Sequence, residues 1–314
     1  MIGNDPGLSI ADNYRAFARE AATGRSPLYV VIANGIAEDD ELIAFLAAQP
    51  PAKRQPNLLL GAVRFLYGTQ QGYDAFRAAV LEHREEVAAT LATRRTQTNE
   101  AGRCASLLPV LASLPEPLAL LEVGAAAGLC LIPDRFAYRY DQYQLGDSEL
   151  VLECTTSGSP PLPGKVPRIA WRAGIDIAPV DVTDDDAIAW LEALVWPDRP
   201  DRAERLRRAV ALARRDPPTV HAGHLLDLLE PLAAQAPANA TLVVFHTAVL
   251  AYLEDARRAE FVRRVRAMDC HWISNEGPNV IPAHGPGPAS KFVLALDGHP
   301  VAHSDPHGAT LDWL

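Results

Sequence analysis

The sequence predicts a mixed α/β protein in which a helical N-terminal domain precedes a mainly parallel β-sheet. Every periodic stretch before about residue 115 repeats its apolar residues at helical spacing. After Leu114-Pro115-Glu116-Pro117, short apolar runs alternate with amphipathic helical segments. Strands that alternate with helices imply right-handed crossovers and a parallel sheet covered on both faces. We therefore expect an all-α domain over residues 1–115 and a sheet domain over residues 116–314.

Composition limits the class of protein further. The 314 residues are 48% hydrophobic, which is enough to bury one large core or two moderate ones. The formal net charge of −10 leaves no basic surplus for phosphates, so we expect no nucleic-acid partner. The sequence shows neither a signal peptide nor an apolar run of about 18 residues. We expect a cytoplasmic protein without membrane attachment, and no pattern indicates its oligomeric state.

Helix signals define the N-terminal domain. Ser9 and Asp12 form a capping box, and Ser26-Pro27 occupies the N-cap and N1 positions of a second helix. Further helices are expected over Asp39–Ala48, Leu58–Tyr67, Asp74–Thr93 and Asn99–Ser113.

The sheet domain begins with a buried strand at Leu118–Val123 that enters Gly124. Four further strands are predicted at Arg168–Ile177, Thr219-Val220, Thr241–Phe245 and His271–Ser274. Helices are predicted between them at Asp184–Leu194, Arg202–Arg215, Leu225–Ala234 and Ala256–Ala267. The tail from Lys291 to Leu314 lacks a helix and should form an antiparallel edge hairpin. An insertion over about 131–168 contains Tyr138, Tyr140 and Tyr143, which either line a substrate mouth or cover the sheet as a hairpin.

The first strand carries the most informative motif, Leu120-Leu121-Glu122-Val123-Gly124-Ala125-Ala126-Ala127-Gly128. Small residues there let the backbone turn sharply and let a ligand approach the following helix. The string resembles motif I of class I S-adenosylmethionine (SAM) dependent methyltransferases, E/D-x-G-x-G-x-G, with Ala126 in place of the middle glycine. The resemblance implies a Rossmann-like fold and SAM contacts by Glu122, Gly124, Ala125 and Gly128. On this hypothesis, Gly124→Val abolishes SAM binding and leaves the melting temperature nearly intact.

Three further strand ends fit the same plan. Asp176 could accept hydrogen bonds from ribose hydroxyls, and Asp141 is the alternative because it is closer to the usual spacing. His224 follows the third strand and could lie near the adenine. His246 follows the fourth strand at the expected active-site edge. Because ligands of open α/β sheets bind outside the carboxyl ends of the strands, we expect these residues to line one crevice.

Two polar clusters complete the candidate site. The first interrupts two predicted helices, and we expect it to bind substrate over the crevice, close to Glu122 and His246, through Gln97, Asn99, Glu100 and Arg103. A capping role for Thr98 or Asn99 is the alternative. The second follows the strand at Trp272 and contains Glu276, which could act as a general base with His246 or remain in a solvated turn.

The remaining cysteine and histidine patterns do not indicate metal. Cys104, Cys130, Cys154 and Cys270 are widely spaced and read as reduced thiols. His299, His303 and His307 recur at four-residue intervals, but Pro300 and Pro306 exclude one helix presenting all three. We expect no metal site.

The chain also resembles a bacterial family of unassigned function, domain of unknown function 2332. The motifs that carry this resemblance are Gln97-Thr98-Asn99-Glu100-x-x-Arg103-Cys104, Glu122–Leu129, Gly174-Ile175-Asp176, Val195-Trp196-Pro197, Val244-Phe245-His246 and Pro306-His307-Gly308. Membership implies a methyltransferase-like fold and no established substrate.

Three functional hypotheses follow. The first is a SAM-dependent methyltransferase acting on a small-molecule acceptor. The second is a methyltransferase-like protein that binds SAM or another ligand without turnover, which the alanine in motif I favours. The third is a different enzyme on the same scaffold, because a fold does not determine a function.

Overall fold

The computed structural model describes residues 5, 7–285 and 287–314, and the chain divides into two compact units. The first unit comprises Met1–Thr98 and Asp185–Glu204, and the second comprises Asn99–Asp184 and Arg205–Leu314. The sequence placed a boundary near residue 115. The first unit instead ends at Thr98 and takes in a later segment, so its core is built from two separate parts of the chain.

The described elements of the first unit are helices. They are α1 (Ile10–Ala16), the π-helix η1 (Phe17–Ala22), α2 (Pro27–Ala37), α3 (Asp40–Ala47), the short η2 (Pro51–Lys53), α4 (Pro56–Tyr67), α5 (Tyr73–Glu82), α6 (Arg84–Thr93) and α8 (Asp185–Leu194). Side chains of Ser9, Ser26 and Asp39 cap three of these helices by accepting backbone N–H groups, as the sequence predicts for Ser9 and Ser26. The single helix expected over 74–93 is two helices, because His83 leaves the helical region at φ −123° and ψ 38°.

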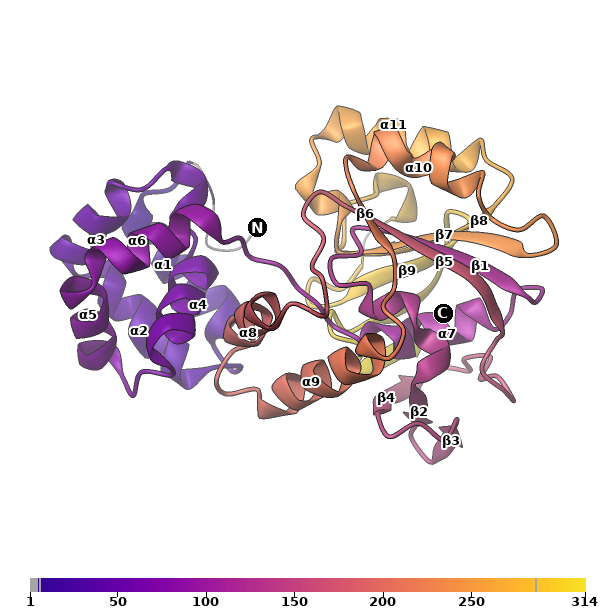
Figure 1. The fold of residues 1–314 in the computed structure, drawn as a ribbon, viewed down its shortest axis with the longest axis horizontal. Coiled ribbons are helices and arrows are strands. Elements are labelled where there is room, and N and C mark those ends of the chain that lie inside the picture. The colour runs from indigo at the N-terminus through magenta and orange to yellow at the C-terminus, as the bar shows by residue number, and fades with distance from the viewer. Residues whose placement is uncertain (1–4, 6, 286) are drawn as a thin grey trace. The chain divides into compact units, whose positions relative to one another are not determined.

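The second unit is built on one mixed sheet, which contains eleven strands in the described part of the chain (Figure 1). The strands are β1 (Leu118–Val123), β2 (Ala137–Tyr140), β3 (Tyr143–Leu145), β4 (Val151–Ser157), β5 (Ile169–Asp176), β6 (Val220–Ala222), β7 (Thr241–Thr247), β8 (His271–Glu276), β9 (Phe292–Leu296), β10 (His299–Ser304) and β11 (Thr310–Trp313). Their spatial order is β3-β2-β4-β11-β10-β9-β8-β7-β1-β5-β6.

Strand β1 lies centrally and is buried along its whole length, as its apolar sequence predicts. It pairs in parallel with β5 on one side and with β7 on the other. β6 continues the parallel set beyond β5, and β8 continues it beyond β7. The carboxyl ends of β1, β5, β7 and β8 therefore meet at one edge of the sheet.

The other half of the sheet differs from the expectation. β9, β10 and β11 are antiparallel neighbours, so the tail does form a hairpin. However, β11 pairs in parallel with β4, and the insertion adds β4, β2 and β3 beyond it. Tyr138 and Tyr140 are buried in this insertion, and their hydroxyls donate to the carbonyls of Pro133 and Ala105. The insertion is thus part of the sheet, and Tyr140 fixes it to the helix that contains Ala105.

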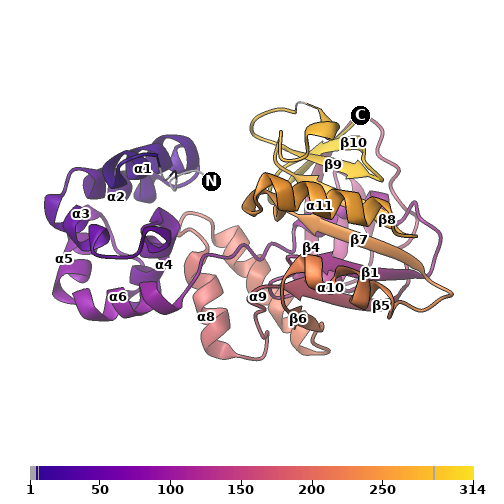
Figure 2. The same cartoon turned by 90° about the horizontal axis from the view of Figure 1, so that it is seen from above.

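Helices cover the two faces of the sheet in the second unit. α10 (Leu225–Ala233) and α11 (Asp255–Arg266) lie along one face (Figures 1 and 2). Their apolar side chains pack on alternate strand residues such as Leu121, Val244 and Trp272. α7 (Arg103–Leu111) lies on the opposite face, and the division between the two units falls within α9 (Pro200–Arg214). The remaining short turns are η3 (Leu129–Leu131), η4 (Pro133–Arg135), η5 (Leu250–Tyr252) and η6 (Pro282–His284). Among the described residues, none of the helices combines the length and apolar character that a bilayer span requires.

Candidate functional site

The sheet separates the predicted site residues into two polar clusters. Side chains alternate between the faces of a strand, and Val123 is paired with His246 while Glu122 is paired with Phe245. His246 therefore points toward α11, whereas Glu122 points toward α7. The same alternation puts Glu276 on the α11 side and Asn275 on the α7 side.

The α11-side cluster consists of His246, Trp272, Glu276 and His284. The indole N–H of Trp272 donates to Nε2 of His246 over 3.0 Å, so the other ring nitrogen carries the proton. That nitrogen, Nδ1, donates to Oε1 of Glu276 over 2.7 Å. Both side chains are buried, at 0% and 1% exposed. The structure thus brings His246 and Glu276 together as their neighbouring strands predict, and uses both ring nitrogens of His246 internally.

Glu276 also fixes the segment that follows β7. Its Oε1 accepts the backbone N–H groups of Val249 and Leu250 over 2.9 and 3.0 Å. The side chain of Val249 in turn contacts Gly124, because a Cβ built there would lie 2.3 Å from Cγ2 of Val249. Gly124 has φ +73° as well. A valine at this position would clash and be strained, so the expectation that Gly124→Val preserves the melting temperature is not supported by this packing.

His284 completes the α11-side cluster. Its ring lies 5.9 Å from that of Trp272. Burial, and then the neighbouring His246, lower the pKa of His284 to about 4, so it is neutral near pH 7. Oε2 of Glu276, Oγ of Ser274 and Nε2 of His284 are buried without a hydrogen-bond partner among the described residues.

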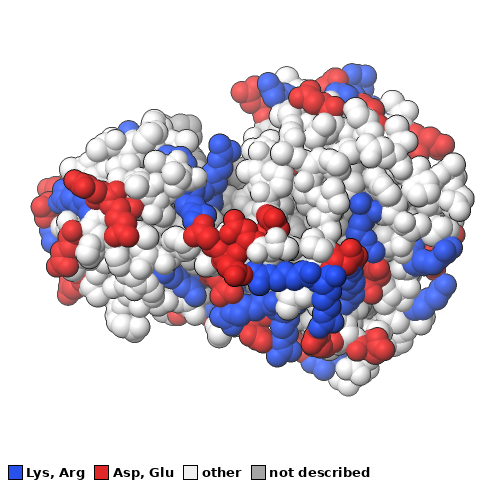
Figure 3. Space-filling model, viewed as in Figure 1, with Lys and Arg blue, Asp and Glu red and all other residues white. Residues whose placement is uncertain are grey.

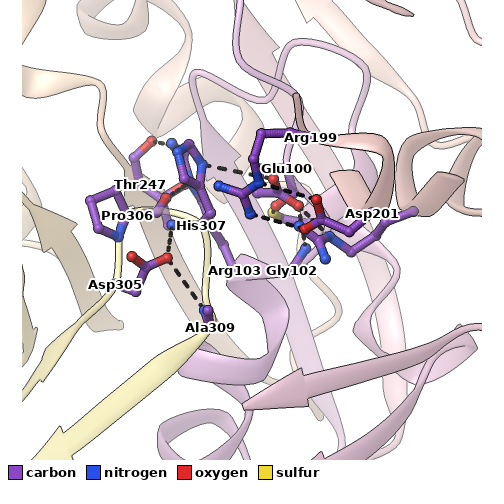
Figure 4. Close-up of polar contacts among 12 residues, drawn as sticks. Glu100, Gly102, Arg103, Arg199, Asp201, Thr247, Asp305, Pro306, His307 and Ala309 are labelled. Carbon is purple, nitrogen blue, oxygen red and sulfur yellow. Dashed lines mark hydrogen bonds and ion pairs between the residues drawn. The ribbon is translucent and has the colours of Figure 1, made fainter. Parts of the chain in front are cut away.

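The α7-side cluster consists of Asn99, Glu100, Arg103, Glu122, Thr247, Asn275 and the Asp305–Gly308 turn. Figure 4 shows how Arg103 joins its parts. Nη1 of Arg103 donates to the carbonyl and the hydroxyl of Thr247 over 3.0 and 3.1 Å, and Nε donates to the carbonyl of Pro306 over 2.9 Å. One guanidinium therefore ties α7 to the end of β7 and to the turn after β10.

Glu100 is one of two buried carboxyl residues of this cluster. Its Oε1 accepts the N–H of Gly102 over 3.1 Å and Nε of Arg205 over 2.7 Å. Its Oε2 lies 3.7 Å from Nδ1 of His307. Figure 3 shows basic side chains gathered over α9, and Arg205 of that helix forms an ion pair with Glu100.

Glu122 lies at the end of β1 on the same side. Burial raises the pKa of its carboxyl well above the usual range, and Cys130 raises it further while Arg103 opposes the rise. Oε2 of Glu122 and Nδ2 of Asn275 have no hydrogen-bond partner in the described part of the chain. The amide oxygen of Asn275 accepts the hydroxyl of Ser304 over 2.8 Å. Unpartnered buried polar atoms are rare in proteins and mark places where a ligand or a water can bind.

The loop after β1 is held by its own chain. The N–H of Ala126 donates to Oδ2 of Asp176, and the N–H of Ala127 donates to Oδ1 of Asn99, each over 2.8 Å. Nδ2 of Asn99 has no partner among the described residues. Ala125 packs against Gly174: a Cβ added at Gly174 would lie 2.6 Å from the Cβ of Ala125. Gly128, at φ +67°, similarly faces Pro218. Packing within the chain is therefore by itself a reason for glycine at positions 174 and 128.

His224 and Asp141 lie apart from these clusters. His224 is the N-cap of α10 and accepts the N–H of Leu226 at Nδ1. Asp141, the alternative ribose residue, binds Thr156 in the insertion. Gln97 belongs to the first unit, whereas Asn99, Glu100 and Arg103 belong to the second. Cys104, Cys130, Cys154 and Cys270 are free thiols. In the described ranges, three or more acidic, histidine or cysteine side chains do not group as metal ligands.

Sequence reasoning assigned no role to Thr247, Asn275 or Arg205. Thr247 and Asn275 are polar residues at the ends of otherwise apolar strands, which is a signal that the sequence does carry. Arg205 is one arginine among several on α9, so only the fold distinguishes it.

The comparisons with known proteins assign the chain to a family. A model of the family described as "Uncharacterized protein conserved in bacteria (DUF2332)" matches residues 11–313. No curated protein and no solved structure matches the chain. Three motifs that suggested the family from sequence, around Glu100–Arg103, Val244–His246 and Pro306–Gly308, meet at the end of β7. Because the match spans nearly the whole chain, the protein belongs to the DUF2332 family of uncharacterised bacterial proteins.

Proposed function

We propose that the second unit is a Rossmann-like domain that binds SAM and transfers its methyl group to a small-molecule acceptor. The observation that carries the proposal is the order of the parallel strands. Numbered along the chain as β1, β5, β6, β7 and β8, they read 3-2-1-4-5 across the sheet. Doubly wound nucleotide-binding sheets have this order, and their ligands bind where it reverses, here between β1 and β7. The SAM-type motif lies at that point.

The residues present fit the three polar parts of SAM. Both oxygens of Asp176 are oriented by backbone N–H groups of Ala126 and Ala178, and a carboxylate retains further lone pairs for ribose hydroxyls. The unpartnered oxygen of Glu122 suits the amino group, whose charge would favour the ionised carboxylate. Nδ2 of Asn99 suits the carboxylate of the methionyl part.

An apolar surface for the adenine stands next to Asp176. The side chain of Ile177 is 69% exposed at the carboxyl end of β5. Exposed branched apolar side chains gain free energy when an aromatic base covers them. When bound, SAM would supply an electrophilic methyl group, and the chain's task would be to position the acceptor in line with it.

A specific observation favours the second hypothesis, ligand binding without turnover. The N–H groups of Ala126 and Ala127 are already bonded within the chain, and Val249 contacts Gly124. A ligand at this edge must therefore be held by side chains rather than by the loop N–H groups. This arrangement is also compatible with another enzyme on the scaffold, which a ligand other than SAM would reveal.

Calorimetric titration with SAM and S-adenosylhomocysteine tests the proposal. We expect binding, and we expect Ile177→Ala to weaken it by about 5- to 10-fold, because the substitution removes about 1 kcal/mol of apolar contact. Val31→Ala, which truncates another exposed apolar side chain in the first unit, is the matched control and should bind normally. Turnover with a metabolite panel separates a methyltransferase from a binding protein. Absence of binding by the parent protein would refute the SAM assignment.

A further inference from the structure

His307 is the titratable side chain of a turn that is fixed on several sides. Oδ1 of Asp305 accepts the N–H of His307 over 2.8 Å, and the carbonyl of Asp305 accepts the N–H of Gly308 over 3.0 Å. Gly308 has φ +84°, and a Cβ there would lie 2.0 Å from the carbonyl oxygen of Gly102. The turn thus packs backbone against backbone on the start of α7, which only glycine permits. A side chain carried on such a turn has a defined position.

Glu100 stands beside the imidazole of His307. Oε2 lies 3.7 Å from Nδ1, while Oε1 is held by Gly102 and Arg205. A carboxylate beside Nδ1 favours the tautomer protonated there, which leaves the lone pair of the neutral ring on Nε2. Hydrogen-bond distances between catalytic residues are often long in free enzymes and shorten when substrate binds. Glu100 is buried and His307 is partly exposed. In such a pair the buried carboxylate orients the imidazole, and the exposed imidazole is accessible to a substrate.

The pair adjoins the point where the strand order reverses. On one side, Arg103 binds Pro306 and Thr247 with the same guanidinium, so the turn lies against the end of β7. On the other side, Asn99 accepts the N–H of Ala127, and the carbonyl of Glu100 accepts the thiol of Cys130 over 3.6 Å. The segment 99–103 therefore joins the loop after β1 to the turn that carries His307.

We propose that His307 is the general base of this site, with Glu100 as its positioning residue, and that the acceptor is a hydroxyl or an amine. The proposal rests on the proposed function for the methyl donor. The acceptor's lone pair forms the new bond to the methyl carbon, and the C–S bond breaks with its electrons left on sulfur. The acceptor's proton passes to Nε2 of His307. Within the second unit, the carboxylate of Glu100 lies beside the imidazole. Arg205 binds that carboxylate, Arg103 binds the carbonyl of the preceding Pro306, and Asp305 accepts the backbone N–H of His307.

This assignment replaces the pair expected from sequence. His246 uses Nε2 to accept from Trp272 and Nδ1 to donate to Glu276, and it is fully buried. Proton transfer at either nitrogen would break one of these bonds. His307 lies on the opposite face of the sheet and is 26% exposed at its side chain.

The first test needs no cofactor. In histidine-labelled protein, the NMR signal of His307 is identified by its loss in His307→Asn, and its titration is compared in the parent and in Glu100→Gln. Glutamine retains an oxygen for Gly102 and Arg205 but removes the charge. We expect the pKa of His307 to fall in Glu100→Gln, because the carboxylate no longer stabilises the imidazolium. An unchanged pKa would overturn the pairing. His299→Asn, an exposed histidine of β10, is the control and should leave the titration of His307 unchanged.

The second test measures methyl transfer to hydroxyl and amine acceptors. We expect His307→Asn to reduce turnover by about 100-fold or more, Glu100→Gln to reduce it and shift the pH profile, and His299→Asn to retain it. S-adenosylhomocysteine affinity should stay within about twofold, since neither residue is assigned to the donor. Full turnover in His307→Asn would refute the base. If the parent binds no S-adenosylhomocysteine, the proposed function fails, and the NMR titration alone still decides whether Glu100 controls His307.

Discussion

At the scale of single residues, Glu122 is the one charged side chain of the otherwise apolar strand β1. Five of the six strand residues are apolar, and the carboxyl group of Glu122 is buried among them with one oxygen unpartnered. Desolvation raises its pKa well above the usual range, and the charge of Arg103 only partly opposes this. The neutral form is therefore favoured in the folded protein, and ionisation costs stability.

Glu122→Gln should flatten the dependence of stability on pH. In the unfolded chain the carboxyl titrates near about pH 4.3. Because the folded pKa is higher, the folded state holds the extra proton, and stability falls as pH rises from the unfolded toward the folded pKa. Urea unfolding of the parent should show this decline, and Glu122→Gln should lack it.

Glu116→Gln is the matched control for this measurement. The backbone N–H of Arg168 and the ammonium of Lys165 lower the pKa of Glu116. Glu116 therefore affects stability with the opposite sign: the stability that it contributes is lost as the pH falls through its pKa in the folded protein. Parallel pH curves for the parent and Glu122→Gln would contradict the buried, neutral state of Glu122.

At the scale of elements, β7 and β8 are joined by side chains as well as by their ladder. His246 from β7 links Trp272 and Glu276 from β8, and Glu276 extends the connection to the N–H groups of Val249 and Leu250. Except for the N–H of the partly buried Val249, these groups are buried, so a lost partner leaves an unsatisfied donor or acceptor. The cluster accordingly stabilises the carboxyl ends of β7 and β8 and the segment that follows β7.

His246→Ala should lower the free energy of unfolding of the second unit by about 3 kcal/mol, from the cavity and the unpartnered indole N–H. Hydrogen exchange of the β7 and β8 amides measures this loss. His299→Ala, at an exposed position, should change it by less than about 0.5 kcal/mol. A stable His246→Ala protein that lost only turnover would restore His246 as the catalytic base.

The sequence predicts the parallel strands better than it predicts the insertion or the site. β1 and β7 are apolar runs between turn residues, and such runs are recognisable without tertiary information. For the insertion, the sequence left open whether its tyrosines line a substrate mouth or form a β-hairpin that covers the sheet. It could not decide, because the stability of β2–β4 comes from pairing with β11 and from the hydrogen bonds of buried Tyr138 and Tyr140. The face on which a strand-end residue lies depends on the register of the strands, which the sequence does not show. For this reason the sequence predicts His246 and Glu122 in one crevice, although they lie on opposite faces of the sheet.

At the scale of the whole molecule, one helix of the later sequence belongs to the first unit. α8 follows β5 in the chain, and its apolar pattern predicts a crossover helix of the sheet. It instead packs in the first unit, where Trp190 is 4% exposed and its indole N–H donates to the carbonyl of Arg95. A Cβ at Gly61 of α4 would lie 2.8 Å from Leu194 of α8. Local periodicity shows that a helix has an apolar face but not which core receives it.

Trp190→Ala tests this division of the chain. Removing a buried tryptophan should destabilise the unit that contains it by about 3–5 kcal/mol. Because Trp190 contacts Phe65 and binds Arg95, we expect hydrogen exchange to accelerate in α4 and α8 while β1 and β7 keep their protection. Trp171→Ala is the matched control, since Trp171 of β5 is partly buried against the core of the second unit and should give the opposite pattern. Equal loss of protection in both units would mean that they unfold as one cooperative body. The assignment of α8 to the first unit would then have no consequence for stability.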